Sequence, residues 1–191
     1  ETTLAVITKP MEFFAEMPTT GGHNAPLTYA MIGGVLGMLL QVFCQFPMEM
    51  VAGGLGTTGP SFQNAFPGAT GGLAGGVGAA FCCGPFVSLL AVYINAALMH
   101  LALSMTGGAN GDFECTVRVL SYTYGAATPL GSLPLIGCLF NIYSLVLNAI
   151  GLHKAHQCEV WQAVVAVLAP IVFCCGLIGG VVGLAVLGSM A

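Results

Sequence analysis

One short stretch of the chain brings together side chains that can bind metal. It contains His153, His156, Cys158 and Glu159 in the spacing H-x-x-H-x-C-E. Imidazole, thiolate and carboxylate groups are ligands of zinc and copper. The spacing matches no established zinc motif. The four residues are therefore weak metal candidates, and we favour the alternative, a polar loop at a membrane surface.

A second polar group lies in the middle of the chain, between two apolar runs. It consists of Asp112, Glu114, Arg118 and Tyr122, and we call it the hinge. Asp112 suits the N-cap of a helix and Glu114 its first turn. Glu114 and Arg118 are four residues apart and can pair on one helix face. We expect this pair to fix a water-exposed connection between two membrane spans; the alternative is an ion pair that gates a pathway.

Further polar residues lie inside the apolar runs. Asn141, Ser144 and Asn148 follow a helical period along one stripe, and Asn95 and His100 lie in an earlier run. Polar side chains within a membrane commonly form hydrogen bonds between helices, and we favour this role. The second interpretation is a polar pore or substrate site lined by the stripe, with His100 as a proton relay.

Several functions lack the residues that they require. The sequence contains no arrangement of nucleophile and base, no paired catalytic carboxylates and no phosphate-binding loop. It has three Lys and Arg residues, which form no basic patch for a nucleic acid. We therefore predict a protein that is not an enzyme, uses no cofactor and binds no nucleic acid.

The composition indicates where the protein resides. Of its 191 residues, 57% are hydrophobic and 5% are charged, whereas a soluble domain carries roughly a quarter charged residues. Uncharged runs long enough to cross a bilayer recur along the chain. The sequence therefore predicts an all-α fold, a polytopic transmembrane helical bundle in contact with membrane lipids.

The apolar runs predict about five spans. We expect a transmembrane domain over residues 27–190, with spans at about 27–46, 84–104, 113–128, 134–152 and 161–187. Pro47 is expected to close the first span, and a Gly-rich loop over residues 49–78 to follow it. Pro129 and Pro134 are expected to bracket a tight turn.

Small residues indicate where these helices approach one another. Gly33 and Gly37 have the G-x-x-x-G spacing that permits close packing in lipid. Gly137 and Gly151 lie at the two ends of the polar stripe in the fourth span. We expect the first and fourth spans to pack closely against neighbours along these faces.

Residues 1–26 form a short N-terminal lead. Pro10 is placed to begin a short helix, with acidic residues on one side and Phe13 and Phe14 on the other. Such a helix either lies in the membrane interface with its Phe side chains inserted or covers the end of the bundle. The sequence leaves both interpretations open.

Five spans place the two termini on opposite sides of the membrane. Lys9, Arg118 and Lys154 then share one face, which the positive-inside rule makes cytoplasmic. We therefore expect a cytoplasmic N-terminus and a C-terminus outside.

Several short segments, taken in order, resemble one protein family. They are Lys9-Pro10-x-x-Phe13-Phe14, Gly107-Gly108 followed by Phe113-x-x-Thr116-x-Arg118-Val119-x-x-Tyr122, then Pro129, Pro134 and Gly137, and finally Ile150-Gly151-Leu152-His153-Lys154-Ala155-His156. This order resembles the Yip1 family of small five-span membrane proteins, and within it the short bacterial and archaeal members. The resemblance implies a helical membrane bundle with a cytosolic N-terminus, here in a prokaryotic cell (inner) membrane. Eukaryotic members are associated with vesicle trafficking and small GTPases of the Rab type, and they carry longer cytosolic N-terminal regions than this lead.

Two functions remain in competition. The first is a non-enzymatic membrane organiser or adaptor, acting on a protein partner or as a homo-oligomer through its helix faces and hinge. The second is a small oligomeric transporter or channel. A continuous water-accessible cavity lined by Asn95, Asn141 or Asn148 would favour transport. A solid bundle with a grooved or lipid-filled side would favour the adaptor.

Overall fold

The structure, a computed structural model, is built from helices. It describes residues 2–18, 21–54, 77–78, 81–134 and 136–190. Within them, the helices are α1 Thr2–Thr8, α2 Pro10–Glu16, α3 Asn24–Gly54, α6 Gly84–Thr106, α7 Phe113–Gly131, α8 Gly137–His156 and α9 Val160–Met190. The all-α class predicted from the sequence is confirmed.

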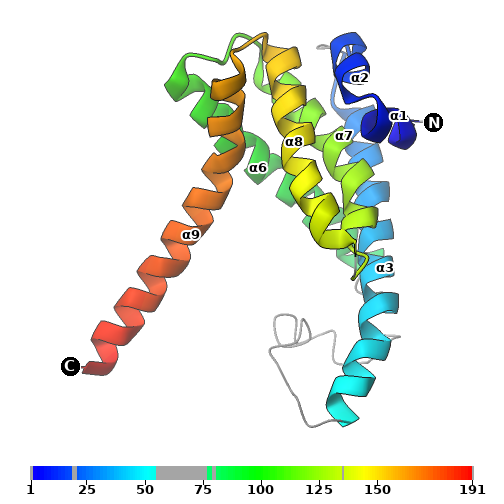
Figure 1. Cartoon of the computed structure of the whole chain (residues 1–191), viewed down its shortest axis with the longest axis vertical. Helices are drawn as coiled ribbons and strands as arrows, with labels where there is room; N and C mark the ends of the chain where they lie inside the picture. The colour runs from blue at the N-terminus through cyan, green and yellow to red at the C-terminus, as the bar shows by residue number, and fades with distance from the viewer. Residues whose placement is uncertain (1, 19–20, 55–76, 79–80, 135, 191) are drawn as a thin grey trace.

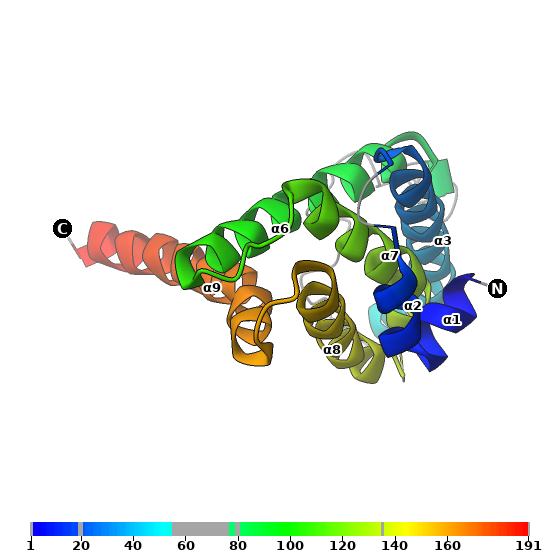
Figure 2. The ribbon, with the colours of Figure 1, turned by 90° about the horizontal axis from the view of Figure 1, so that it is seen from above.

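The five long helices run alternately between two ends of the molecule (Figure 1). One end carries α1, α2 and the two connections at residues 107–112 and 157–159, and we call it the hinge end. The connection between α7 and α8 lies toward the opposite end (Figure 1). Seen from above, α6 and α9 extend to one side, while α3 and α7 lie together on the other (Figure 2).

In the part of the chain that the structure describes, three helices are long and apolar enough to cross a membrane. They are α3 over Asn24–Cys44, α6 over Gly84–Thr106, and α9 over Val160–Leu177. Their outer faces carry large exposed apolar side chains, for example Leu36, Phe86 and Phe173. Apolar surface of this extent needs lipid around it, so the protein is an integral membrane protein.

Glycine allows α3 and α7 to touch along their backbones. A Cβ on Gly33 would lie against the backbone of Gly125 in α7, and one on Gly37 would meet the methyl group of Thr128 at 2.6 Å. The neighbouring Gly34 makes room in the same way for Ser88 of α6. The close approach predicted from the G-x-x-x-G spacing is therefore confirmed, with α7 as the main partner.

The pair α7 and α8 meets at two further glycines. A Cβ on Gly151 would overlap the side chain of Val119, and one on Gly137 would overlap the carbonyl oxygen of Gly131. The two ends of the predicted stripe are thus both close-packing positions. As a result, α7 lies between α3 and α8, and 11 of its 19 residues are buried.

Two prolines do not end helices where the sequence predicted. The helix α3 continues through Pro47 to Gly54, and α7 contains Pro129 and continues to Gly131. A proline inside a helix removes one backbone hydrogen bond, and the rest of the helix carries on when its packing outweighs that loss. The described turn residues before α8 are therefore 132–134 and 136, and Pro129 does not begin this turn.

Two boundaries differ as a consequence. Residues 49–54 of the predicted Gly-rich loop are helical, and residues 55–76 lie outside the described part of the chain. The helix α8 begins at Gly137 and ends at His156, so the segment predicted as a polar loop supplies its last turn. Gln157 ends α8 in a left-handed conformation with φ 49°.

Candidate functional site

A buried arginine holds the lead against the start of α7. Arg118 is 4% exposed, and its terminal nitrogens donate to the backbone carbonyl oxygens of Pro18 and Gly22, each at 2.7 Å. Its Nε donates to Glu114 Oε1 at 3.1 Å. Glu114 Oε1 also accepts the N–H of Gly22 at 2.8 Å. We call these four residues the arginine clamp, because one guanidinium joins the lead to α7.

The clamp keeps Glu114 ionised. This residue lies in the first turn of α7, at the hinge end and outside the three candidate spans. The hydrogen bond from the N–H of Gly22 is the largest cause that holds the pKa of Glu114 below its ordinary value, and the hydrogen bond from Arg118 adds to it. The pair predicted from the i, i+4 spacing is thus present.

Asp112 lies at the N-cap of α7, as predicted. Its backbone is extended, with φ −66° and ψ 161°, but its side chain makes no capping hydrogen bond. The backbone carbonyl of Asp112 instead accepts the N–H of Cys115 at 3.0 Å. Asp112 therefore takes no part in the clamp.

Aromatic packing adds an apolar layer beneath the clamp. Tyr122, the last predicted hinge residue, has its ring centroid 5.3 Å from Phe13 and 5.6 Å from Tyr29. Phe14 is 2% exposed and packs where Gly151 leaves space on α8. The helix α2 therefore covers the end of the bundle, which decides between the two interpretations of the lead.

Two tyrosines missed by the sequence reasoning complete the attachment. Tyr143 of α8 donates its hydroxyl to the backbone carbonyl of Ile7 at 2.6 Å, and the hydroxyls of Tyr29 and Thr3 are 2.7 Å apart. Both tyrosines lie within apolar runs, where an aromatic side chain commonly serves the core. No spacing in the sequence connects them to residues more than twenty positions away.

A chain of hydrogen bonds joins three helices next to the clamp. The N–H of Gly111 donates to His156 Nδ1 at 3.1 Å. His156 Nε2 lies 2.9 Å from Thr116 Oγ1, which is 3.0 Å from His100 Nδ1. One buried hydroxyl thereby connects α6, α7 and α8.

The hydrogen bonds of this chain all run in one direction from donor to acceptor. A backbone N–H can only donate, so His156 Nδ1 accepts, and in the neutral ring Nε2 carries the proton. Nε2–H then donates to Thr116, whose own hydroxyl proton is available for His100. Burial, together with the nearby His100, lowers the pKa of His156 to about 4, in the last turn of α8. His156 is therefore neutral at pH 7, and His100 takes part in a hydrogen bond between α6 and α7.

The four weak metal candidates form hydrogen bonds with different partners. His153 Nδ1 lies 2.6 Å from the carbonyl oxygen of Cys158, whose thiol faces the carbonyl oxygen of Leu152 at 3.8 Å. Glu159 accepts the indole N–H of Trp161 at 2.6 Å, and His156 belongs to the hydrogen-bond chain. Within the described residues, no three His, Cys, Asp or Glu side chains gather as a metal site would require.

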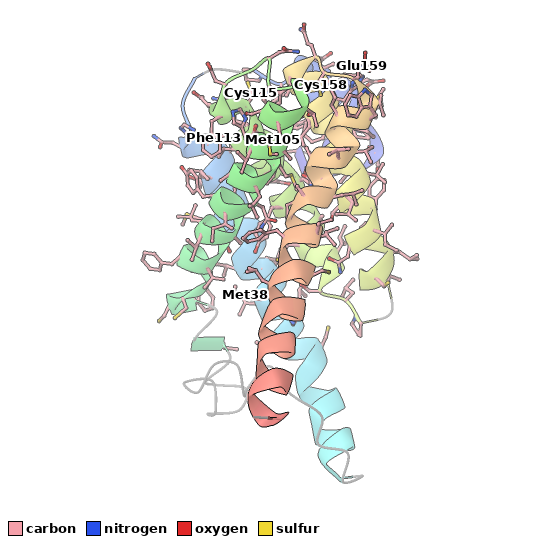
Figure 3. All side chains as sticks on the ribbon, turned by 90° about the vertical axis from the view of Figure 1, so that its left-hand side faces the viewer. Met38, Met105, Phe113, Cys115, Cys158 and Glu159 are labelled. Carbon is pink, nitrogen blue, oxygen red and sulfur yellow. The ribbon has the colours of Figure 1, made fainter. Side chains whose placement is uncertain are left out.

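Figure 3 shows this end of the molecule in side view. Phe113, Cys115, Cys158 and Glu159 lie together there, whereas Met38 lies well down the bundle (Figure 3). The hinge end thus contains polar and sulfur-bearing side chains in a packed layer. Packing of this kind can hold the hinge end in a fixed shape.

The predicted polar stripe faces a cavity of about 970 Å³. Helices α6, α7, α8 and α9 supply most of its lining, which includes Asn95, Asn141, Ser144 and Asn148. Asn95 and Asn141 each donate to a carbonyl of their own helix, four residues earlier, at 2.8 and 2.9 Å. Among the described residues, the hydrogen bonds between helices predicted for these Asn side chains are thus represented by one long contact, from Asn141 to Gly131 at 3.4 Å.

The cavity stops short of the hinge end. Its lining reaches Met99 on α6 and Asn148 on α8, and the buried side chains of Leu103, Val117 and Leu152 fill the bundle beyond. His100 is absent from the lining. The structure therefore has a pocket in one half of the bundle and a packed layer in the other.

The comparison with protein families agrees with this arrangement. A family model described as the Yip1 domain matches residues 4–183. No match is found among curated proteins or among solved structures. The matched segment runs from within α1 to within α9 and contains the arginine clamp, the hydrogen-bond chain and the whole of α3, α6, α7 and α8. This protein therefore belongs to the Yip1 family.

Proposed function

We propose that this protein is a non-enzymatic membrane organiser or adaptor that presents its hinge end to a partner protein. The arginine clamp is the observation that carries this proposal. A guanidinium that is almost completely buried is committed to two carbonyl groups of the lead, so α1 and α2 form a fixed surface. A lead that moved freely would not offer two fixed carbonyl groups to a buried guanidinium.

The proposed topology has five crossings with the hinge end in the cytoplasm of a prokaryotic cell. In support of this, Lys9, Arg118 and Lys154 all lie at the hinge end, which the positive-inside rule assigns to the cytoplasm. The helices α7 and α8 are flanked by the three candidate spans and alternate with them in direction (Figure 1). Their end turns then belong to the aqueous layer, and the C-terminus lies outside.

The cavity does not support the transporter alternative. The feature expected of a transport path was a continuous cavity, and the lining of this cavity ends at Met99 and Asn148. Here the half that contains Leu103, Val117 and Leu152 is closely packed and bonded through the histidine chain. A one-ended pocket is consistent with a bundle that has a grooved side.

Site-specific photo-crosslinking in native membranes tests the adaptor role. A photoreactive amino acid is placed at Met11 or Glu16, both exposed on α2, and as a control at Leu139, which is exposed near the other end of α8. We expect one protein adduct shared by both lead positions and absent at Leu139. The same adduct should weaken when Arg118→Gln releases the lead. Adducts with lipid alone at all three positions would overturn the proposal.

A further inference from the structure

The cavity between α6, α7, α8 and α9 contains polar atoms that lack a partner. Thr123 is 2% exposed, and its Oγ1 has no hydrogen-bond partner among the described residues. The same holds for Oδ1 of Asn148. Both residues line the cavity. A buried polar atom without a partner is destabilising, so these two atoms indicate a place where a bound molecule would form hydrogen bonds.

The remaining polar groups of the lining mostly need donors. Asn95 and Asn141 use their amide nitrogens on carbonyl groups of their own helices. A carbonyl only accepts, so each amide is oriented with its oxygen left over. Together with Asn148 Oδ1, the site offers three amide oxygens, and a bound molecule has to supply N–H or O–H groups to them.

Charge narrows the class of ligand further. None of the lining residues that the structure describes is Asp, Glu, Lys, Arg or His. An ion placed there would lose its hydration without gaining a counter-charge. The ligand is therefore uncharged. The volume of about 970 Å³ lies at the upper end of the range of roughly 300–1,000 Å³ typical of small-molecule sites.

The position of the mouth indicates where such a ligand enters. Among the lining residues, Cys138 and Ile142 of α8 and Ile171 of α9 are exposed, whereas Thr123 and Leu120 on α7 are buried. The cavity thus opens between α8 and α9 and has its floor on α7. Beyond Pro170, α9 runs away from the bundle (Figure 1). In a membrane this mouth faces lipid.

We propose that this cavity binds a neutral lipid with a hydroxyl-bearing head, such as a monoacylglycerol. The head donates hydrogen bonds to Asn148 and Thr123, and the acyl chain leaves through the apolar mouth between α8 and α9. This site requires the helices to lie in a bilayer. It does not require the adaptor role, since no residue of the clamp lines it.

Photo-labelling of the full-length protein in phosphatidylcholine vesicles tests this site. The probe is a monoacylglycerol with a diazirine in its acyl chain, and the control probe has both hydroxyl groups methylated. We expect the first probe to label residues of the lining on α8 and α9, and unlabelled monooleoylglycerol to compete. Equal labelling by the methylated probe, or labelling spread evenly over the outer faces of α3 and α6, would overturn the proposal.

Two variants and one matched control separate binding from general effects. Thr123→Val and Asn148→Leu each remove a polar group from the cavity, and Thr28→Val removes a similar group from an exposed position on α3. Loss of one neutral hydrogen bond is expected to weaken competition by about three- to ten-fold. The Thr28 variant should behave as the wild type. Unchanged competition in both cavity variants would contradict the assignment.

The cysteine at the mouth gives a readout that needs no variant. Monooleoylglycerol should slow the reaction of Cys138 with a membrane-permeant maleimide, read by peptide mass spectrometry, while Cys82 should react at the same rate. Equal rates at Cys138 with and without the lipid would count against the site. So would protein–protein cross-links through Cys138 in place of protection, since they would assign the mouth to a second copy of the chain.

Discussion

Arg118 is the residue on which the hinge end depends. Removing a guanidinium from water is costly, and the cost is offset only when its donors find good acceptors. Here Glu114 supplies charge, and the carbonyl oxygens of Pro18 and Gly22 supply fixed geometry. The planar guanidinium donates to all three acceptor residues at once, whereas a lysine ammonium is a single point of charge.

Arg118→Gln should release the lead from α7. Hydrogen bonds to a charged group contribute about 1.5–3 kcal/mol each, so the loss of two should raise hydrogen exchange in residues 2–18 by at least ten-fold. Arg118→Lys should give an intermediate result. Lys9→Gln, which removes the exposed pair with Glu12, is the control and should change little. Unaltered exchange of the lead in Arg118→Gln would show that the clamp does not hold it.

Acidification should weaken the hydrogen-bond chain before it weakens the clamp. The pKa of His156 is lowered to about 4 from 6.5, so its neutral form belongs to the folded state. The contribution of His156 to the free energy of unfolding is complete above pH 6.5 and is lost as the pH falls toward 4. The lowered pKa of Glu114 makes the clamp fail at lower pH, below the ordinary value of a carboxyl group.

The unfolding midpoint of the detergent-solubilised protein, followed from pH 7 to pH 4, measures this effect. His156→Gln should be less stable at pH 7 and should show a flatter pH dependence in this range. His153→Gln changes a residue in the same turn of α8 that is not part of the hydrogen-bond chain. This variant should keep the wild-type dependence of the midpoint on pH. A wild-type midpoint independent of pH would contradict the account of His156.

At the scale of elements, α7 is the central helix, against which α3 and α8 pack. Its two glycine contacts, Gly125 with α3 and Gly131 with α8, remove the side chains that would hold the helices apart. Its polar residues face the hinge end and the cavity. This explains why a span that is short and polar by composition is the most buried of the five, as judged from the side chains that the structure describes.

Gly125→Ala should destabilise the bundle. An added Cβ there would overlap Tyr29 of α3, and overpacking of this kind costs about 1–3 kcal/mol. We expect a lower unfolding midpoint. The matched control is Gly176→Ala, whose added Cβ meets no atom within 4 Å. Equal midpoints for the two variants would mean that α3 and α7 are not held in backbone contact.

The sequence predicted the elements better than their ends. Apolar runs and the G-x-x-x-G spacing identified the helices and the contact face of α3, because both depend on local composition. Proline was a poor guide to helix ends. Pro47 and Pro129 lie inside helices, since packing along the rest of the helix compensates for one absent backbone hydrogen bond.

At the scale of the molecule, the sequence revealed half of the clamp. Glu114 and Arg118 are neighbours on one helix, so their pairing follows from spacing. Their other partners, Pro18 and Gly22, are about a hundred residues away and contribute backbone atoms, which leave no trace in residue type. The chain from His100 through Thr116 to His156 was hidden for the same reason, since three helices have to meet before it exists.

The account depends on which side of the membrane each end of the helical bundle faces. Cysteine labelling measures this directly. Single cysteines are placed at Asn110, Gln157 and Pro134 in a chain otherwise free of cysteine, and an impermeant maleimide is added to intact cells. The account predicts that the first two positions react only after the membrane is permeabilised, and that position 134 reacts without it. Labelling of Asn110→Cys and Gln157→Cys from opposite sides, or of both in intact cells, would contradict it.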